Sequence, residues 1–347
     1  MVVLALWFGI ARVLLGSKTK TDDAFPPSLS FEGRTVLITG GTSGLGLETA
    51  IHYVNLGAAS VIITARTLTK GNDAKFEIEE RTGRKDVVGV MVLVMDTFAA
   101  VKTFVEELRI SVKKIDIVLL NAGVHNFDFK QSPDGWEGDI QVNTLSTLLL
   151  GLLLLPWLRE IQQPGQTQHL GFVGSSSHYT PDISKFPRQG VLDSRNKPEN
   201  FVSGMHTYAI SKLLFHYGAL ELAKLAVDEN GSPSPIVNIV CPGMIRTNIA
   251  RDFASKGIFF KIAEAVIMSI ICNPVDVGAR SLVLIATTTP DQHGTFRNPM
   301  LTKDEYDLKS APMLTSPEGK RMQAQVWKEI TEVLVAAVPE IADTIRS

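Results

Sequence analysis

Short apolar segments alternate with longer amphipathic segments along most of the chain, from about residue 31 onward. The apolar segments are rich in Val and Ile, which favour strands, and glycine bounds several of them. A strand that is covered on both faces reads as a continuous apolar run, and amphipathic stretches between such runs indicate helices. The pattern therefore predicts an α/β fold, doubly wound around a parallel sheet.

Six strands can be assigned along this pattern. They are RTVLITG (34–40), SVIITAR (60–66), VVGVMVLVMD (87–96), IDIVLLNAG (115–123), HLGFVGSS (169–176) and PIVNIVCPG (235–243). Helices are predicted at 43–56 and 68–82, with further helical stretches between the later strands. No internal repeat interrupts the alternation, so a single domain spanning about residues 31–300 is expected.

Two segments fall outside this alternation. Residues 180–204 are polar, with several prolines and charges, and we interpret them as an insertion between two core elements. Loops of that length are commonly functional. Residues 317–337 form an amphipathic helix that carries Trp327, so 301–347 is expected to be a helical extension packed on the domain's edge.

The two most apolar stretches raise the question of a membrane. Residues 1–16 are apolar but are interrupted by Arg12, and a spanning helix needs about 20 residues. Residues 1–30 are therefore expected to be an apolar helix and a linker. The helix could pack on the protein itself, contact a membrane surface, or belong to an export signal, although neither a basic start nor a cleavage site is clear. The stretch LLLGLLLLPWL (148–158) is also short, and it predicts a buried helix on the sheet's flank or in a subunit interface.

Composition narrows the class of protein. Apolar residues make up 45% of the 347 positions and charged residues 20%, as in globular enzymes. The net charge of −2 offers no electrostatic basis for binding nucleic acid. The only cysteines, Cys241 and Cys272, provide neither a disulfide framework nor metal-ligand spacing, so no metal is expected. They suit a reducing compartment, and we expect a cytoplasmic protein.

A glycine-rich turn, TGGTSGLG, links the first strand to the first helix. Glycines let the backbone turn sharply and approach a pyrophosphate at the helix N-terminus, where free N–H groups favour anions. The spacing GxxxGxG is weak evidence alone, and a plain structural turn is the alternative. At a first strand–helix junction it predicts dinucleotide binding by Gly40, Thr42, Ser43, Gly44, Leu45 and Gly46.

The end of the second strand indicates which dinucleotide is preferred. A carboxylate there would bind the ribose 2′-hydroxyl of NAD, whereas an arginine accommodates the extra phosphate of NADP. The sequence TARTLTK has no acidic residue and carries Arg66 and Lys70. This pattern favours NADP(H), and two solvated cations are the alternative.

The segment YAISK places Tyr208 and Lys212 four residues apart, on one face of a helix. A phenol has a pKa of about 10, and a nearby fixed cation would lower it. Such a pair can move a proton on and off an alcohol oxygen. The spacing alone is common on surface helices, so its meaning depends on the rest of the chain.

In order along the chain, TGGTSGLG, Asp96, NAG at 121–123, Asn143, the GSSS strand end, YAISK and CPGMIRT resemble the short-chain dehydrogenase/reductase family. The resemblance covers residues 35–247, and more weakly extends to about 300. It looks closest to the retinol-dehydrogenase-like branch and the fungal secondary-metabolism branch, whose members act on lipophilic substrates. It implies a single Rossmann domain and a dimer or tetramer.

The resemblance also implies a role for each matching residue. Tyr208 would be the acid and base, Lys212 would lower its pKa and hold the nicotinamide ribose, and Ser175 would bind the substrate oxygen. Ser176 is the neighbouring alternative, because the triple serine blurs the register. Asn143 would hold a water next to Lys212. The further cofactor contacts would be Asp96 at the adenine, Asn121, Ala122 and Gly123 on the adenosine side, and Pro242, Gly243, Ile245 and Thr247 at the nicotinamide.

Some of these residues have other interpretations. Asp96 could cap the following helix, and Asn143 could be an ordinary helix residue. His125, His178 and His206 read as loop or rim residues rather than bases. Thirty-three residues separate Ser175 from Tyr208, more than is common in the family, which indicates a distinct substrate wall.

The expected function is that of an NADPH-dependent oxidoreductase, a ketoreductase or alcohol dehydrogenase. Its substrate would be a small lipophilic carbonyl or alcohol that is polyketide-, terpenoid- or steroid-like. The apolar N-terminus and the stretch GIFFKIAEAVIMSII (257–271) favour such a substrate. The alternative is a non-catalytic NADP-binding regulatory or scaffold protein.

Overall fold

The structure is a computed structural model that describes residues 25–163, 165–245 and 272–346. The expected apolar helix of residues 1–16 therefore lies outside the described residues. The apolar stretch 257–271 and Thr247 lie outside them too.

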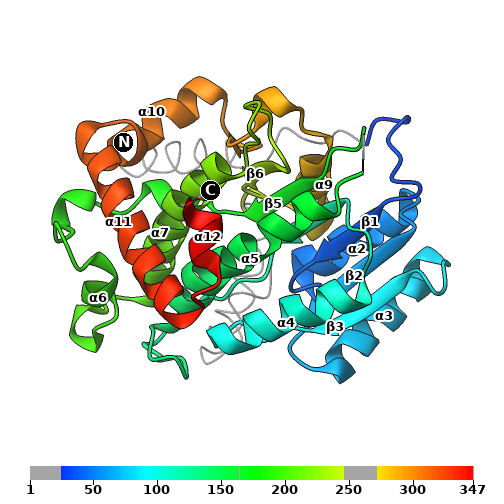
Figure 1. The fold of residues 1–347 in the computed structure, drawn as a ribbon, viewed down its shortest axis with the longest axis horizontal. Helices are drawn as coiled ribbons and strands as arrows, with labels where there is room; N and C mark the ends of the chain where they lie inside the picture. The colour runs from blue at the N-terminus through cyan, green and yellow to red at the C-terminus, as the bar shows by residue number, and fades with distance from the viewer. Residues whose placement is uncertain (1–24, 164, 246–271, 347) are drawn as a thin grey trace, which may run out of the picture.

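The core is a seven-stranded sheet in the order β3-β2-β1-β4-β5-β6-β7, with every neighbouring pair parallel (Figure 1). The six predicted strands are all present. A seventh, two-residue strand pairs with the end of β6 and was not predicted, because two residues carry no period. The strands are β1 Thr35–Ile38, β2 Ser60–Ala65, β3 Val88–Val92, β4 Ile117–Leu120, β5 His169–Val173, β6 Ile236–Val240 and β7 Phe296–Arg297.

Helices cover both faces of the sheet, and alternate strand residues face the two layers. In β1, Leu37 belongs to one apolar cluster, while Val36 and Ile38 belong to the other. The first layer contains α4 Phe98–Ser111, α5 Thr147–Glu160 and α7 Gly204–Leu225, and the second contains α2 Gly44–Asn55, α3 Leu68–Thr82 and α9 Val275–Val283. The predicted doubly wound α/β fold is confirmed.

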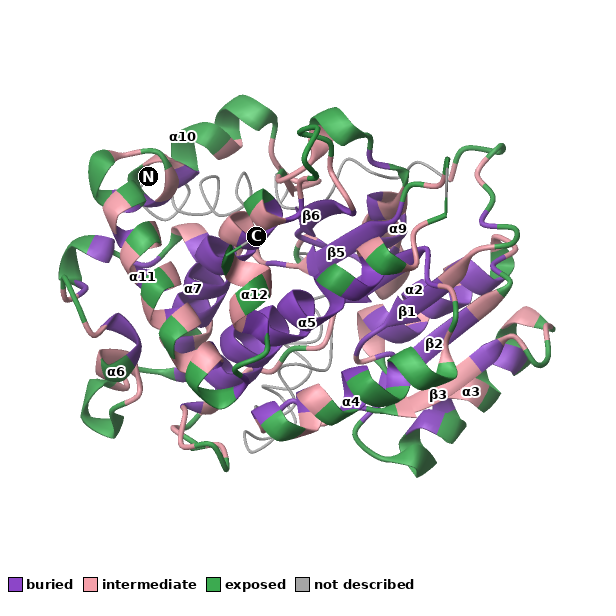
Figure 2. Ribbon diagram, in the orientation of Figure 1, coloured by how far each residue is buried: buried purple, intermediate pink, exposed green. Residues whose placement is uncertain are grey.

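The apolar stretch at 148–158 lies in α5, which continues from a π-helical turn, η1 Ile140–Ser146. Together they form a helix apolar and long enough to cross a membrane, yet 94% of its most apolar window is buried within the protein. The prediction of a buried helix on the sheet's flank is confirmed. Figure 2 shows α5 and α7 as the most deeply buried helices of their layer.

The predicted C-terminal helical extension packs onto this same layer. It contains α10 Lys303–Leu314, α11 Pro317–Ala337 and α12 Ile341–Arg346. Helix α11 contacts α7, and α12 contacts α5. Met322, Val326, Ile330 and Leu334 of α11 are fully buried at the spacing of one helix face, so the extension contributes to the core.

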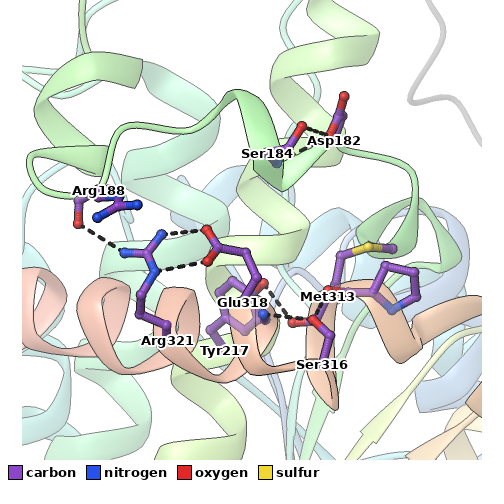
Figure 3. Close-up of polar contacts among 10 residues, drawn as sticks. Asp182, Ser184, Arg188, Tyr217, Met313, Ser316, Glu318 and Arg321 are labelled. Carbon is purple, nitrogen blue, oxygen red and sulfur yellow. Dashed lines mark hydrogen bonds and ion pairs between the residues drawn. The ribbon is translucent and has the colours of Figure 1, made fainter.

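The insertion at 180–204 has short helical turns and is bound to the extension. It contains η3 Ile183–Lys185, α6 Val191–Arg195 and η4 Pro198–Asn200, and it follows η2 Ser176–Tyr179. Arg321 of α11 pairs with Glu318 and donates to the carbonyl oxygen of Arg188 at 3.5 Å (Figure 3). Two further single turns, η6 Leu284–Thr287 and η7 Pro290–Gln292, connect α9 to β7.

Candidate active site

The glycine-rich turn follows β1, beside β4, where the strand order reverses direction. Gly40 and Gly44 have φ angles of +68° and +57°, which side chains rarely adopt. A Cβ on Gly46 would lie 2.4 Å from the carbonyl oxygen of Gly40, so no side chain fits. Open α/β sheets bind ligands at such a switch point, and the turn has the conformation that brings backbone close to a phosphate.

A threonine that the sequence did not single out ties this turn to β4. The Oγ1 of Thr39 accepts hydrogen bonds from the backbone nitrogens of Asn121 and Ala122, both at 2.9 Å. The side-chain Nδ2 of Asn121 donates back to the carbonyl oxygen of Thr39 at 2.8 Å. Asn121 is therefore a brace for the turn, and the partly exposed Ala122 and the exposed Gly123 continue along the same edge.

The start of α2 offers backbone donors to a ligand. Ser43, at the N-cap, makes no side-chain capping bond, and the first turn carries no acidic residue. The leading N–H groups of the helix then have no side-chain acceptor of their own, as an anion site requires. Thr42 and Leu45 are partly exposed beside it.

The far end of β2 presents the two predicted cations. Arg66 and Lys70 are exposed, and no described carboxylate forms an ion pair with either. Asp96 is also exposed. It does not cap α4, because Thr97 does so by accepting from Ala100 at 3.3 Å. The capping interpretation of Asp96 is therefore wrong.

The triple serine resolves into two different environments. Ser175 lies next to the phenol of Tyr208, and its hydroxyl lowers the pKa of that phenol. Ser176 turns away, with its Oγ 3.2 Å from the Sγ of Cys241 and accepting from Asn298 at 3.1 Å. The structure thus brings Ser175, rather than Ser176, to Tyr208 across the 33-residue separation.

Burial dominates the protonation of the Tyr208–Lys212 pair. Burial raises the pKa of Tyr208 to about 12, and the nearby hydroxyl of Ser175 opposes this change. Burial lowers the pKa of Lys212 to about 8, and the charge of Asp139 opposes that change. In this structure, the ammonium of Lys212 is not among the groups that lower the phenol pKa of Tyr208. The Nζ of Lys212 lies 5.8 Å from the Tyr208 ring centroid and donates to the carbonyl oxygen of Val173 at 3.0 Å.

Asn143 lies in the π-helical turn, and both polar atoms of its side chain form hydrogen bonds with neighbouring residues. Its Oδ1 accepts from the nitrogen of Val124 at 2.8 Å, and its Nδ2 donates to the carbonyl oxygen of Val124 at 2.9 Å and to Ser211 at 3.0 Å. A Cβ on Gly123 would meet both Asn143 Oδ1 and Lys212 Nζ, at 3.1 and 3.8 Å. Asn143 is therefore close to Lys212 and is not an ordinary helix residue. Such π turns are frequent at functional sites.

The segment after β6 reaches the same edge. Pro242 and Gly243 follow the strand, and Gly243 has a φ of +88°. A Cβ on Gly278 would lie 2.5 Å from Ile245 and 2.9 Å from Leu45, so these two predicted residues meet at one glycine. Ile245 forms a bridge with Asn273.

The sequence analysis did not predict the positions of three side chains near the site. The ring of His125 lies 5.0 Å from that of Tyr208 and stacks on Phe127 at 4.8 Å. Asp139 is fully buried, although nothing in the sequence distinguishes it from a surface carboxylate. His178, expected at a loop or rim, is fully buried because it stacks on His216 at 4.1 Å.

One described group of side chains has the spacing of a metal site, namely Glu48, His52 and Asp276. Its carboxylates are already neutralised by Arg81 and Arg280. We therefore assign it to ion pairing.

The residues present fit a dinucleotide. The turn has no room for a side chain at Gly46, the α2 N-terminus has no side-chain cap, and Arg66 has no described acidic partner. The three features are aligned along the carboxyl edge of β1, β2 and β4.

Comparison with known proteins gives consistent matches. The family model described as short chain dehydrogenase matches residues 34–166. The short-chain dehydrogenase/reductase phmF of Phaeosphaeria nodorum is 35% identical over 323 residues, 91% of this chain and 90% of that protein. The short-chain dehydrogenase/reductase ffsI of Aspergillus flavipes is 34% identical, with coverage of 91% and 90%. Both relatives come from fungi, as the resemblance led us to expect.

Solved structures share the fold. A short chain dehydrogenase of Shigella flexneri, complexed with NADP, superposes with a TM-score of 0.58 at 22% identity and covers 80% of this chain and 100% of its own. The RhlG/NADP complex of Pseudomonas aeruginosa gives 0.59 at 23% identity, with coverage of 78% and 96%. At such identities the likeness concerns the fold alone.

Proposed function

The chain belongs to the short-chain dehydrogenase/reductase family, and from that premise we propose that it is an NADP(H)-dependent enzyme that interconverts a carbonyl and an alcohol on a lipophilic small molecule. The observation that carries the proposal is the meeting of Ser175, Tyr208 and Lys212 beside the glycine-rich turn. These residues come from two different elements, so chance helix spacing does not account for their meeting.

The cofactor would lie along the carboxyl edge of the sheet. The N–H groups at the start of α2 would bind the pyrophosphate, and Gly44 and Gly46 would let it approach the backbone. The guanidinium of Arg66, together with Lys70 in the first turn of α3, would bind the 2′-phosphate in a charge-assisted contact. Asp96 would meet the adenine, and Ile245 would lie near the nicotinamide. The NADP found in the two solved relatives is consistent with this preference.

A bound nicotinamide supplies or accepts the hydride. In the reduction direction, negative charge develops on the carbonyl oxygen. The neighbouring hydroxyls of Ser175 and Tyr208 are the donors that would stabilise it. Because the pKa of Tyr208 is about 12, its phenol is protonated at neutral pH and can act as the acid.

Lys212 would replace the proton that Tyr208 gives up. A pKa of about 8 lets its ammonium lose a proton near physiological pH more readily than an exposed lysine could. Asn143 holds the neighbouring backbone rigid through Val124, which would keep a path open between Lys212 and solvent.

Apolar side chains around the site support a lipophilic substrate. Val202, just before α7, and Met205, in its first turn, are 73% and 63% exposed, and Met244, after β6, is 42% exposed. Met205 lies one helical turn before Tyr208, on the same helix. Large apolar side chains exposed around a polar centre mark sites that bind apolar partners. A polyketide-, terpenoid- or steroid-like carbonyl would suit them, and the end of the insertion, where Phe201 meets Phe129, would form one wall.

The described site residues all come from one chain, and Thr247 lies outside the described residues. We also propose the homo-oligomer that the resemblance implies, and light scattering of the purified protein tests it. Both cysteines are buried and form no disulfide with each other, which is compatible with the proposed cytoplasmic location.

The test is turnover by the wild type and by Tyr208→Phe, with NADPH oxidation as the readout and a panel of lipophilic ketones as substrates. We expect Tyr208→Phe to lose about 10²- to 10⁴-fold in kcat while its NADPH affinity is unchanged. Tyr53→Phe, which removes a buried hydroxyl bonded to Val283 at 3.3 Å, is the matched control. Full activity of Tyr208→Phe would refute the catalytic assignment. NADPH binding without turnover of any ketone would favour a regulatory protein.

A further inference from the structure

A buried histidine fixes the backbone at Ser175. The carbonyl oxygen of Ser175 accepts two hydrogen bonds from His178, one from its backbone nitrogen at 3.1 Å and one from its ring Nδ1 at 2.7 Å. His178 itself is fully buried. These two hydrogen bonds therefore fix the peptide that follows Ser175.

The partners of His178 determine its tautomer. A carbonyl oxygen can only accept, so Nδ1 must carry the hydrogen. Burial lowers the pKa of His178 to about 4, so the ring is neutral at physiological pH and Nε2 is an acceptor. The hydroxyl of Tyr306 lies 3.2 Å from Nε2 and must be the donor. Tyr306 therefore donates a hydrogen bond to His178, and His178 donates one to the carbonyl oxygen of Ser175.

The same cluster contacts the helix that carries Tyr208 and Lys212. His216 lies one helical turn after Lys212 on α7, and its ring stacks on His178 at 4.1 Å with an interplanar angle of 4°. Its Nε2 is 3.4 Å from the Tyr306 hydroxyl, whose single hydrogen already goes to His178, so His216 must donate. Phe296 of β7 packs against both histidines and against Tyr306.

We propose that Tyr306 and His178 are positioning residues for Ser175, and that the C-terminal extension thereby completes the active site. Tyr306 belongs to α10, outside the sheet domain, yet it is two hydrogen bonds away from the Ser175 backbone. This inference rests on the proposed function, since it takes Ser175 as the hydroxyl that binds the substrate oxygen. Small displacements of such a donor lower catalysis, because its value depends on fixed geometry.

The experiment is a double-mutant cycle on kcat with Tyr306→Phe and Ser175→Ala, using the ketone that the wild type turns over fastest. Tyr306→Phe keeps the ring on Phe296 and removes only the hydroxyl. We expect it to lower kcat about fivefold to tenfold with the Kd for NADPH unchanged. Ser175→Ala should cost about a hundredfold or more, and adding Tyr306→Phe should then cost nothing further.

The matched control is Tyr217→Phe. Tyr217, on α7, is fully buried, and its hydroxyl donates to the carbonyl oxygen of Met313 in α10 at 2.9 Å (Figure 3). It links the same two helices without touching the Ser175 segment. Because Tyr306 is only partly buried, Tyr217→Phe should lower stability at least as much as Tyr306→Phe but leave kcat unchanged.

The outcomes separate the inference from the function. If Ser175→Ala retains full kcat, the proposed function fails. Two other outcomes refute the positioning role when Ser175→Ala is impaired. In the first, Tyr306→Phe lowers kcat by the same factor in the wild type and in Ser175→Ala. In the second, Tyr306→Phe lowers kcat no more than Tyr217→Phe does.

The imidazole ¹⁵N shifts of His178 give a test without substrate. We expect a protonated Nδ1 and an Nε2 resonance that changes in Tyr306→Phe, and a protonated Nε2 in the wild type would overturn the inference.

Discussion

Glu329 accepts a hydrogen bond from the backbone nitrogen of Leu192 at 2.9 Å, which joins helix α11 of the extension to the first turn of α6 in the insertion. Its other carboxylate oxygen accepts from the nitrogen of Gly190 at 2.7 Å. Gly190 is the N-cap of α6 and has no side chain that could cap the helix. A single carboxylate from a distant helix thus satisfies donors that a local Ser or Asp would otherwise bind.

Glu329→Gln should loosen the insertion. An amide offers one accepting oxygen and places an NH₂ group against the other donor, so one buried contact becomes unfavourable, at a cost of about 1–3 kcal/mol. We expect faster hydrogen exchange at residues 188–196, measured by mass spectrometry, and a smaller change in the exchange rate in the rest of the protein. Glu332→Gln, on the same helix and paired among the described residues only with Lys328 at 3.8 Å, is the control. Equal exchange in the two variants would show that Glu329 does not hold the insertion.

Arg66→Ala should abolish the preference for NADPH over NADH. A charge-assisted contact to a phosphate contributes about 1.5–3 kcal/mol, so the Kd for NADPH should rise about 10- to 100-fold while that for NADH stays constant. Energy transfer from tryptophan to the reduced nicotinamide measures both constants. Lys113→Ala removes an exposed cation next to the opposite end of the sheet and should change neither. A wild type that binds both cofactors equally would contradict the assignment of Arg66.

Gly46→Ala should disrupt the turn itself. The new methyl would lie 2.4 Å from the Gly40 carbonyl oxygen and 2.6 Å from Asn121 Nδ2, so both must shift. Overpacking of this kind costs about 1–3 kcal/mol, and the displaced turn should weaken NADPH binding as well. Gly89→Ala is the control, because its methyl would meet only Ile62 at an ordinary 3.6 Å. Thermal unfolding and cofactor titration of both variants check this, and unchanged NADPH binding by Gly46→Ala would contradict it.

Local signals account for what could be predicted from the sequence. Helix α3 has the predicted limits because Thr67 caps its start and Gly83, with a φ of 69°, ends it. The burial of α5 followed from its composition, since a stretch so apolar must be covered.

Features that depend on distant contacts could not be predicted. The burial of His178 requires His216 and Tyr306, which are 38 and 128 positions away in the chain. The helical turns of the insertion depend on Glu329, and the raised pKa of Tyr208 depends on how deeply its phenol is buried. In each case the deciding partner is adjacent in space but remote in sequence.

Asp139 should make stability depend on pH. Its Oδ1 accepts from the backbone nitrogen and the Nδ2 of Asn126, at 2.9 and 2.8 Å, whereas its Oδ2 has no hydrogen-bond partner among the described residues. Burial, and then the charge of Glu137, raises the pKa of Asp139 from 3.8 to about 7. Because the folded pKa is the higher one, its favourable contribution is complete below pH 3.8 and is lost as the pH rises through 7.

The wild type should therefore lose up to about 4 kcal/mol of unfolding free energy between pH 4 and pH 8 through this group, the linkage value of a shift of that size. Asp139→Asn keeps an acceptor for Asn126 and cannot ionise, so its stability should vary less over the same range. Urea unfolding at several pH values measures the difference between the two proteins. Parallel pH profiles would show that Asp139 does not ionise in this range in the folded protein.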